Sequence, residues 1–346
     1  MHAVLQQKGL SPLSAITPYF QQEIGRGEAI RMSLRSRKLF DILQHHPSSL
    51  LNSSRFRLPC PPYHNADYWT RLHKDMSPDD VHEWGGFDLH DGLLQFRYET
   101  LLHYRGDKSA SKVAVEQHQR QGEVHTTTFS ECMGISQFST IEEAIGRYEE
   151  LQNQTTSEKN TGGNESILLI GCGNSKIGEQ ILMSSFIGPV LQIDISSKII
   201  QLMTQRYQKY FREASVKRME LIVDDARGLT SLSSESVGGG VLDKGLVDVL
   251  HCSTGNGDDD DAAEGNPIRN IVESVHRVLQ PSRPFVFFSR SEPEYILKRT
   301  LGTVNLNSDR RIRQKWKEIQ VLKLVDLEIL LYRFVKADPS RKKAER

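Results

Sequence analysis

Two glycines separated by one residue follow a short apolar run in this chain of 346 residues. The run 167–170 ends at Gly171-Cys172-Gly173-Asn174, and apolar residues return at helical spacing at Ile177 and Ile181. This pattern predicts a buried strand, a tight turn and the start of a helix. Glycine lets the backbone approach a ligand closely, and asparagine tolerates a left-handed backbone. Such a turn suits a nucleoside at the carboxyl edge of a parallel sheet.

The spacing of the glycines distinguishes two classes of nucleoside cofactor. A dinucleotide fingerprint requires Gly-x-Gly-x-x-Gly, and Lys176 stands where the third glycine would be. S-adenosylmethionine carries no phosphate and requires only the first two glycines. The methyl donor is therefore the better candidate, and a strand-to-helix turn without a ligand is the alternative that the turn alone leaves open.

Acidic residues follow the next two apolar runs. Asp194 lies roughly 20 residues beyond the glycine turn, where a carboxylate can accept hydrogen bonds from a ribose diol. Asp225 follows the run 219–223 and can accept a hydrogen bond from an adenine amine. The alternative role of either carboxylate is a helix N-cap. The glycine turn that precedes both acids favours the nucleoside interpretation.

A fourth run carries a family resemblance. It contains Asp243-Lys244-Gly245 between two apolar stretches, and Tyr68-Trp69 and Glu83-Trp84 lie upstream of the glycine turn. With these motifs the chain resembles the class I, seven-β-strand methyltransferases, and more narrowly the methyltransferase-like group whose known members methylate translation elongation factor 1-alpha. The resemblance implies an α/β fold, a three-layer αβα sandwich around a Rossmann-like seven-stranded sheet with a C-terminal antiparallel hairpin.

The resemblance also assigns roles to individual residues. Those expected to bind S-adenosyl-L-methionine are Trp69, His73, Trp84, Gly171, Cys172, Gly173, Asn174, Asp194, Ile195, Asp225, Ala226 and Lys244. The resemblance does not assign the catalytic residues. Asp243 and Asp248 are our candidates, because either can orient an acceptor amine, and no metal ion is expected. Packing in the core is the alternative role for both tryptophans and for Cys172.

Four positions depart from the family pattern. Leu246 replaces a threonine, His73 a tyrosine and Gly85 an aromatic residue, while Gly238–Gly240 stands at the start of the fourth strand. Glycine is a poor choice for a central strand, because it has no side chain to pack. These departures bear on the substrate pocket and on the affinity for the cofactor.

The expected function is methylation of a protein lysine, with an elongation factor 1-alpha-like protein as the substrate and partner. A small-molecule methyltransferase whose insertion covers a pocket is one alternative. A catalytically inactive cofactor-binding interaction module is another, and Leu246 and the three consecutive glycines favour it. The sequence gives no indication of the oligomeric state.

The composition changes along the chain and divides it into segments. Residues 1–62 are rich in serine and basic residues and are predicted to be a flexible N-terminal extension, with an organelle transit segment as the alternative. The methyltransferase domain is expected over 63–336, with an insertion at about 86–137, a helix at 140–151 and an acidic loop at about 253–266. Residues 337–346 form a basic tail. The expected location is cytoplasmic, and organellar import through the extension is the alternative.

Composition limits the partners. Lys+Arg and Asp+Glu each number 44, so no net charge attracts nucleic acid and none is expected as a partner. The four cysteines show no Cys-x-x-Cys spacing, which fits neither a disulfide framework nor a zinc site and indicates a reducing compartment. No apolar run approaches the length of a transmembrane helix, so no membrane association is expected.

Overall fold

The computed structural model describes residues 63, 65–82, 96–105, 123–134, 165–183, 186, 188–211, 213–253, 266–306, 309–325, 327 and 329–340. The chain divides into two compact units, Met1–Pro59 and Cys60–Arg346, and every described residue belongs to the second. Trp84, Gly85, the helix expected at 140–151, most of the expected acidic loop and residues 341–346 of the tail lie outside the described residues.

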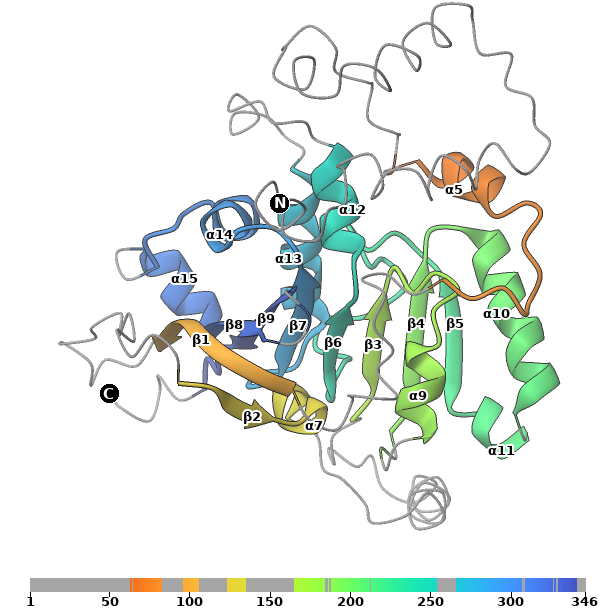
Figure 1. Cartoon of the computed structure of the whole chain (residues 1–346), viewed down its shortest axis with the longest axis horizontal. Helices are drawn as coiled ribbons and strands as arrows, with labels where there is room; N and C mark the ends of the chain where they lie inside the picture. The colour runs from red at the N-terminus through yellow and green to blue at the C-terminus, as the bar shows by residue number, and fades with distance from the viewer. Residues whose placement is uncertain are drawn as a thin grey trace, which may run out of the picture. The chain divides into compact units, whose positions relative to one another are not determined.

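Five parallel strands form one side of the sheet, with β5 at its edge (Figure 1). They are β3 (Ile167–Ile170), β4 (Val190–Asp194), β5 (Met219–Val223), β6 (Gly240–Asp243) and β7 (Pro284–Ser289), in the order β5-β4-β3-β6-β7. The chain leads outward from β3 through β4 to β5 and then returns to β6 on the other side of β3. The strand order therefore reverses between β3 and β6, and such a switch point is where open α/β sheets bind ligands.

A C-terminal hairpin continues this sheet. Strands β8 (Trp316–Leu324) and β9 (Ile329–Lys336) pair antiparallel, and β9 also pairs antiparallel with β7. The family resemblance implied such a hairpin at the end of the domain. The predicted antiparallel hairpin is therefore confirmed, and it brings the number of strands described so far to the seven that the family resemblance implied.

Two further strands lengthen the sheet beyond the predicted seven. Strand β1 (Phe96–Arg105) pairs antiparallel with β8, and β2 (His125–Thr127) pairs antiparallel with β1. The described residues thus form a nine-stranded sheet. Both added strands come from the insertion expected at about 86–137. Local sequence could not assign them to the sheet, because the edge that β1 joins is supplied by β8, far along the chain.

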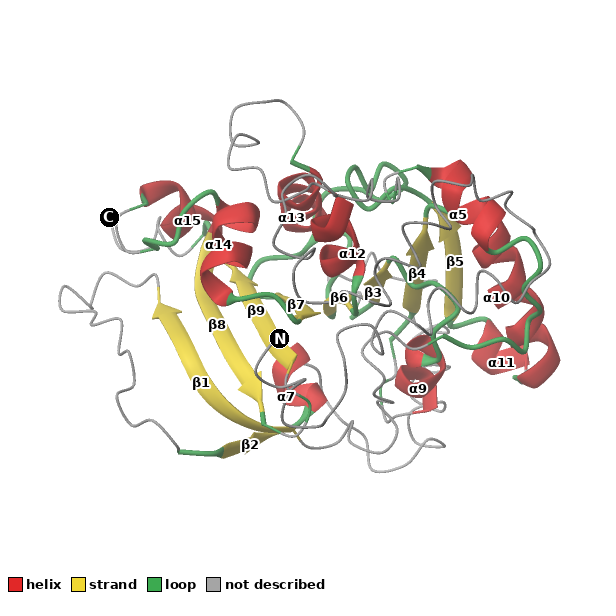
Figure 2. Cartoon of the chain, turned by 45° about the horizontal axis from the view of Figure 1, so that its top comes forward, coloured by secondary structure: helices red, strands yellow, loops and turns green. Residues whose placement is uncertain are grey.

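Helices cover both faces of the sheet (Figure 2). Alternate residues of β3 point to opposite faces, as a strand requires, so Leu168 and Ile170 belong to one hydrophobic cluster and Ile167 and Leu169 to the other. The first cluster includes residues of α12 (Leu246–Ser253), α13 (Pro267–Val278), α14 (Pro293–Leu301) and α15 (Arg310–Lys315). The second includes residues of α7 (Phe129–Met133), α9 (Ile177–Met183) and α10 (Ser197–Tyr210), which α11 (Glu213–Val216) follows. The predicted αβα sandwich is confirmed.

The glycines before the fourth parallel strand are required by close packing. A Cβ on Gly239 would lie 2.4 Å from the backbone oxygen of Glu165. Gly240 has φ +122°, and a Cβ there would lie 2.9 Å from Cε of Met133. Larger residues would push β6 away from the segment that enters β3. The expectation that glycine is poorly suited to the start of this strand is therefore wrong for these two positions.

Candidate cofactor and acceptor site

The glycine turn lies at the switch point, directly after β3 (Figure 1). Gly171 and Gly173 have φ of +58° and +53°, a conformation that favours glycine. A Cβ on Gly171 would lie 2.9 Å from Cβ of Leu246, so this glycine permits the close approach of α12. A Cβ on Gly173 would meet no heavy atom within 4 Å. The turn is therefore closely packed at its first glycine and open at its second.

Asp194 connects the end of β4 to this turn. Its Oδ2 accepts a hydrogen bond from the Gly173 amide at 2.9 Å, and its Oδ1 accepts one from the Ser196 amide at 2.8 Å. Burial raises the pKa of the Asp194 carboxyl, and the two amide hydrogen bonds oppose the rise. A carboxylate offers about four acceptor positions, so each oxygen keeps the capacity to accept from a ligand hydroxyl. This geometry fits the predicted ribose contact.

Aromatic side chains of helix α5 (Ala66–Leu72) and its C-cap lie beside the end of β4. The ring of Trp69 stacks on that of His73 with centroids 5.6 Å apart, and Nδ1 of His73 lies 3.5 Å from Oγ of Ser196. Burial, and then the nearby His82, lower the pKa of His73 to about 4, so its imidazole is neutral near pH 7. His73, which replaces the tyrosine of the family pattern, thus lies next to Ser196. Ser196 in turn follows Asp194 by two residues in the sequence.

Trp69 has a second set of contacts that fixes its ring. Its Nε1 donates to the backbone oxygen of Tyr63 at 2.7 Å, and its ring stacks on that of Tyr63 with centroids 5.5 Å apart. The indole therefore stacks with two other rings, those of Tyr63 and His73. A nucleoside requires space beside the backbone, a hydrogen-bond acceptor and flat apolar surfaces. The open face of Gly173, the Asp194 carboxylate and these rings provide them, respectively.

The two catalytic candidates lie in different environments. Asp243 has no exposed surface, and its oxygens accept hydrogen bonds from the amides of Leu246 at 2.7 Å and Val247 at 2.9 Å. It therefore caps α12, and burial raises the pKa of its carboxyl to about 7. Asp248 is half-buried and accepts from Oγ of Ser289 at 2.5 Å and from the Arg290 amide at 3.0 Å. Of the two carboxylates, Asp248 is the one with exposed surface.

Asp225 has a partner two residues further along the chain. Its carboxylate accepts hydrogen bonds from Nε of Arg227 at 2.9 and 3.0 Å and from the Arg227 amide at 2.9 Å. This pairing orients the side chain that was expected to accept from the adenine amine. Ala226 is buried in the first hydrophobic cluster, and Ile195 and Lys244 are half-buried.

Cys172 and Asn174 occupy the turn in different ways. The Cys172 side chain belongs to the second hydrophobic cluster, and burial raises the pKa of its thiol well above the usual range. The thiol is therefore protonated and packed in the interior, and the predicted contact of this residue with the donor stays a prediction for its backbone. Asn174 is buried, and its Nδ2 donates to the backbone oxygen of Asp80 at 3.0 Å. Among the described residues, no group of three or more His, Cys, Asp or Glu side chains is arranged to hold a metal ion.

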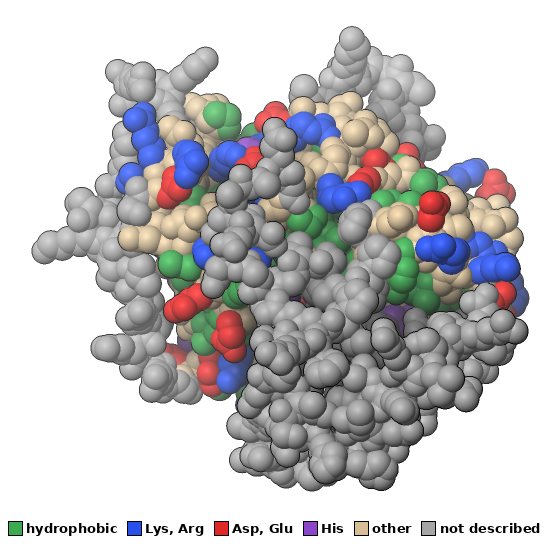
Figure 3. Space-filling view, turned by 90° about the horizontal axis from the view of Figure 1, so that it is seen from above, with side chains coloured by type: hydrophobic (Ala, Val, Ile, Leu, Met, Phe, Trp, Pro, Cys, Tyr) green, Lys and Arg blue, Asp and Glu red, His purple; other side chains and the backbone are tan. Residues whose placement is uncertain are grey.

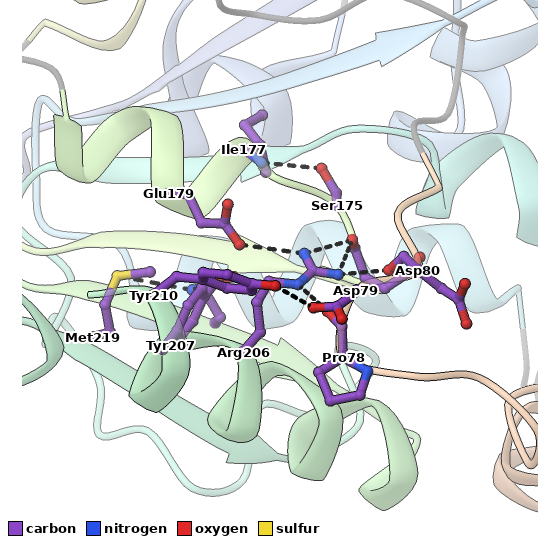
Figure 4. Close-up of polar contacts among 12 residues, drawn as sticks. Pro78, Asp79, Asp80, Ser175, Ile177, Glu179, Arg206, Tyr207, Tyr210 and Met219 are labelled. Atoms are coloured by element: carbon purple, nitrogen blue, oxygen red, sulfur yellow. Dashed lines mark hydrogen bonds and ion pairs between the residues drawn. The ribbon is translucent and has the colours of Figure 1, made fainter.

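Sequence reasoning missed Arg206, which joins this turn to the segment after α5 (Figure 4). Its side chain is 3% exposed, although arginine is rarely buried unless it is paired. A signal was present, because Arg206 follows Met203 by three residues and so continues the apolar face of α10.

On the face seen from above, Lys and Arg side chains are interspersed with Asp and Glu (Figure 3).

No family model matches the chain. EEF1A lysine methyltransferase 4 from Bos taurus is 30% identical over 133 residues, which are 38% of this chain and 48% of that protein. The chain thus spans about half the length of this curated relative. The motifs, this similarity and the sheet topology together confirm the resemblance to the class I methyltransferases.

Solved structures of methyltransferases also align with the chain. A SAM-dependent methyltransferase from Aquifex aeolicus is 12% identical, with a TM-score of 0.34, over 56% of this chain and 98% of that one. The N-methyltransferase NodS from Bradyrhizobium japonicum is 14% identical, with a TM-score of 0.31, over 57% of this chain and 97% of that one. The strand order of the sheet itself is that of a class I methyltransferase fold.

Proposed function

We propose that this chain, which has the motifs and sheet topology of a class I methyltransferase, transfers a methyl group from S-adenosylmethionine to a lysine of a protein substrate. The observation that carries the proposal is the open face of Gly173 beside the Asp194 carboxylate, at the switch point of the sheet. The similarity to an EEF1A lysine methyltransferase supports a protein lysine as the acceptor and an elongation factor 1-alpha-like protein as the partner.

The described residues divide the binding of the donor among them. The backbone of Gly171–Asn174 faces the nucleoside, Asp194 accepts from the ribose, and Trp69 and His73 supply aromatic surfaces. Asp225 and Ala226 are proposed to contact the adenine, and Lys244 the donor carboxylate through a charge-assisted hydrogen bond. When bound, S-adenosylmethionine supplies an electrophilic methyl group on a positively charged sulfur.

The acceptor must be held in line with the methyl group and must be neutral. A lysine amine in water has a pKa of about 10.4, so it has to lose a proton before it can attack. Apolar surroundings lower that pKa because they disfavour the ammonium form. Near Asp248, the rings of His251 and Tyr295 pack with centroids 4.3 Å apart, and their faces are proposed to shield the amine from water. The amine gives up its proton to water before it is bound, and the Asp248 carboxylate orients the neutral amine by accepting a hydrogen bond from one of its N–H groups. In-line positioning then supplies most of the rate.

The departures from the family pattern have packing explanations. Leu246 lies against Gly171 and takes part in the contact between α12 and the glycine turn. Gly239 and Gly240 allow β6 to begin close to neighbouring backbone and side chains. Neither feature therefore favours the inactive interaction module by itself. The cytoplasmic location, with organellar import as the alternative, is proposed from the sequence alone.

The test uses a cell extract and donor labelled on its methyl group. The purified chain is expected to transfer label to a protein band near the size of elongation factor 1-alpha, and lysine should be the labelled residue on hydrolysis. The Asp194→Asn variant should transfer far less label. Label in a soluble metabolite would support the small-molecule alternative, and donor binding without any transfer would support the inactive module.

A further inference from the structure

Arg206 of α10 uses all of its hydrogen-bond donors in the interior (Figure 4). An arginine side chain has five N–H donors. Nε donates to the Pro78 oxygen at 2.7 Å, Nη1 to the Asn174 oxygen at 3.0 Å and to Oε1 of Glu179 at 3.2 Å. Nη2 donates to the Asp80 oxygen at 2.6 Å and to the Asn174 oxygen at 3.1 Å. Five donors therefore meet five acceptor contacts.

These acceptors come from three segments that are distant in sequence. Pro78 and Asp80 lie in the segment that follows α5, Asn174 lies in the glycine turn, and Glu179 lies on α9. Asn174 returns a bond, because its Nδ2 donates to the same Asp80 oxygen at 3.0 Å. The guanidinium thus links both walls of the proposed donor site, the glycine turn on one side and the chain that carries Trp69 and His73 on the other.

We propose that Arg206 is a positioning residue for the methyl donor, an inference that rests on the proposed function. It sets the distance between the aromatic surfaces of α5 and the glycine turn without touching the donor itself. Its two bonds to the Asn174 oxygen fix the orientation of the peptide that joins Asn174 to Ser175, directly after the second glycine. Its bonds to Pro78 and Asp80 hold the segment after α5 against α10.

The role requires arginine rather than any cation. Lysine keeps the charge opposite Glu179, but it has three donors on one nitrogen and cannot reach both walls with a planar fork. Arg206→Lys therefore keeps the positive charge and removes only the planar arrangement of donors. A matched control is available in the same two segments, because Lys209 of α10 pairs with Asp79 at 2.9 Å on the surface, where both side chains are more than half exposed. Such an exposed pair contributes little.

The experiment compares wild type, Arg206→Lys and Lys209→Ala by calorimetry with S-adenosylmethionine and by amide hydrogen exchange without the donor. Arg206→Lys should weaken donor binding at least about tenfold, equivalent to about 1.4 kcal/mol. It should also speed exchange in both 66–82 and 172–176 while exchange in β3–β5 stays unchanged. Lys209→Ala should change donor affinity less than about twofold. With transfer measured as well, Arg206→Lys should raise KM for the donor more than it lowers kcat.

The outcomes distinguish two failures. If wild type binds no donor, the proposed function fails, and the exchange data still show whether the two walls are linked. If wild type binds the donor and Arg206→Lys binds it equally well, the positioning role is overturned. Exchange that rises only within α10 would overturn it too. Should Arg206→Lys not fold, the double variant Arg206→Met/Glu179→Gln, which leaves no unpaired buried charge, is expected to show the same loss of binding and the same exchange in both walls.

Discussion

The two glycines of the cofactor turn should lose different amounts of stability when a methyl group is added to each. Both have positive φ, so alanine at either position costs about 1–2 kcal/mol of backbone strain. A Cβ on Gly171 would lie 2.9 Å from Cβ and 3.1 Å from Cδ2 of Leu246, and such overpacking costs about 1–3 kcal/mol more. A Cβ on Gly173 would meet no atom within 4 Å. Alanine also restricts the unfolded chain, which offsets about 0.4–1 kcal/mol at each position.

The expected loss of unfolding free energy is therefore about 1 kcal/mol for Gly173→Ala and about 2–4 kcal/mol for Gly171→Ala. Urea denaturation at one pH measures both. Gly173→Ala should be the more stable variant but the weaker binder of the donor, because its methyl group enters the open space in front of the turn. That variant should stay folded and bind S-adenosylmethionine at least about tenfold more weakly.

A double-mutant cycle with Leu246→Gly isolates the contact. In the Leu246→Gly background, the cost of Gly171→Ala should fall to that of Gly173→Ala, because the clashing side chain is gone. If the two alanine variants lose equal unfolding free energy while the natural Leu246 is present, the packing argument is refuted. Unchanged donor affinity in Gly173→Ala would refute the assignment of the open face to the donor.

Three further changes test other parts of the site and fold. Asp243 has a pKa of about 7 when folded and an ordinary value of 3.8, so the folded state holds a proton that the unfolded state has lost, and stability falls as pH rises from about 4 to 7. The Asp243→Asn variant should flatten this slope in urea midpoints measured against pH. His73 has a pKa of about 4 when folded and an ordinary value of 6.5, so stability falls as pH drops from 6.5 to about 4, and His73→Phe should flatten that opposite slope. Gly239→Ala should destabilise the fold by about 3 kcal/mol or more, since its Cβ would lie 2.4 Å from a backbone oxygen, whereas Gly228→Ala, with its nearest atom at 3.3 Å, should cost less than about 1 kcal/mol in the same assay.

The central strands could be predicted because their apolar runs record burial on both faces. Each of β3, β4, β6 and β7 is buried along its whole length, and such strands read as continuous apolar runs. The glycine turn and Asp194 could equally be predicted from the sequence, since their chemistry depends on spacing along one β-α-β segment. The hydrogen bond from the Gly173 amide to Asp194 shows why this spacing matters, because the acid also holds the turn.

Features that depend on distant parts of the chain could not be predicted in this way. Strand β1 joins the sheet at β8, and Tyr98 pairs there with Leu324. Gly239 before β6 and Gly240 at its start are explained by contacts with Glu165, Met133 and Pro284. Arg206 is explained by carbonyl groups more than 30 residues away. In each case the sequence shows the residue but not the surface that it meets.

The central claim is that the turn after β3 and the Asp194 carboxylate form a binding site for S-adenosylmethionine. Calorimetry of the full chain, with wild type and Asp194→Asn side by side, tests it most directly. Wild type should bind the donor and its demethylated product, and the variant should bind both at least about tenfold more weakly. The absence of binding heat in wild type at about 1 mM donor, where an affinity of about −4 kcal/mol would be detected, would contradict it.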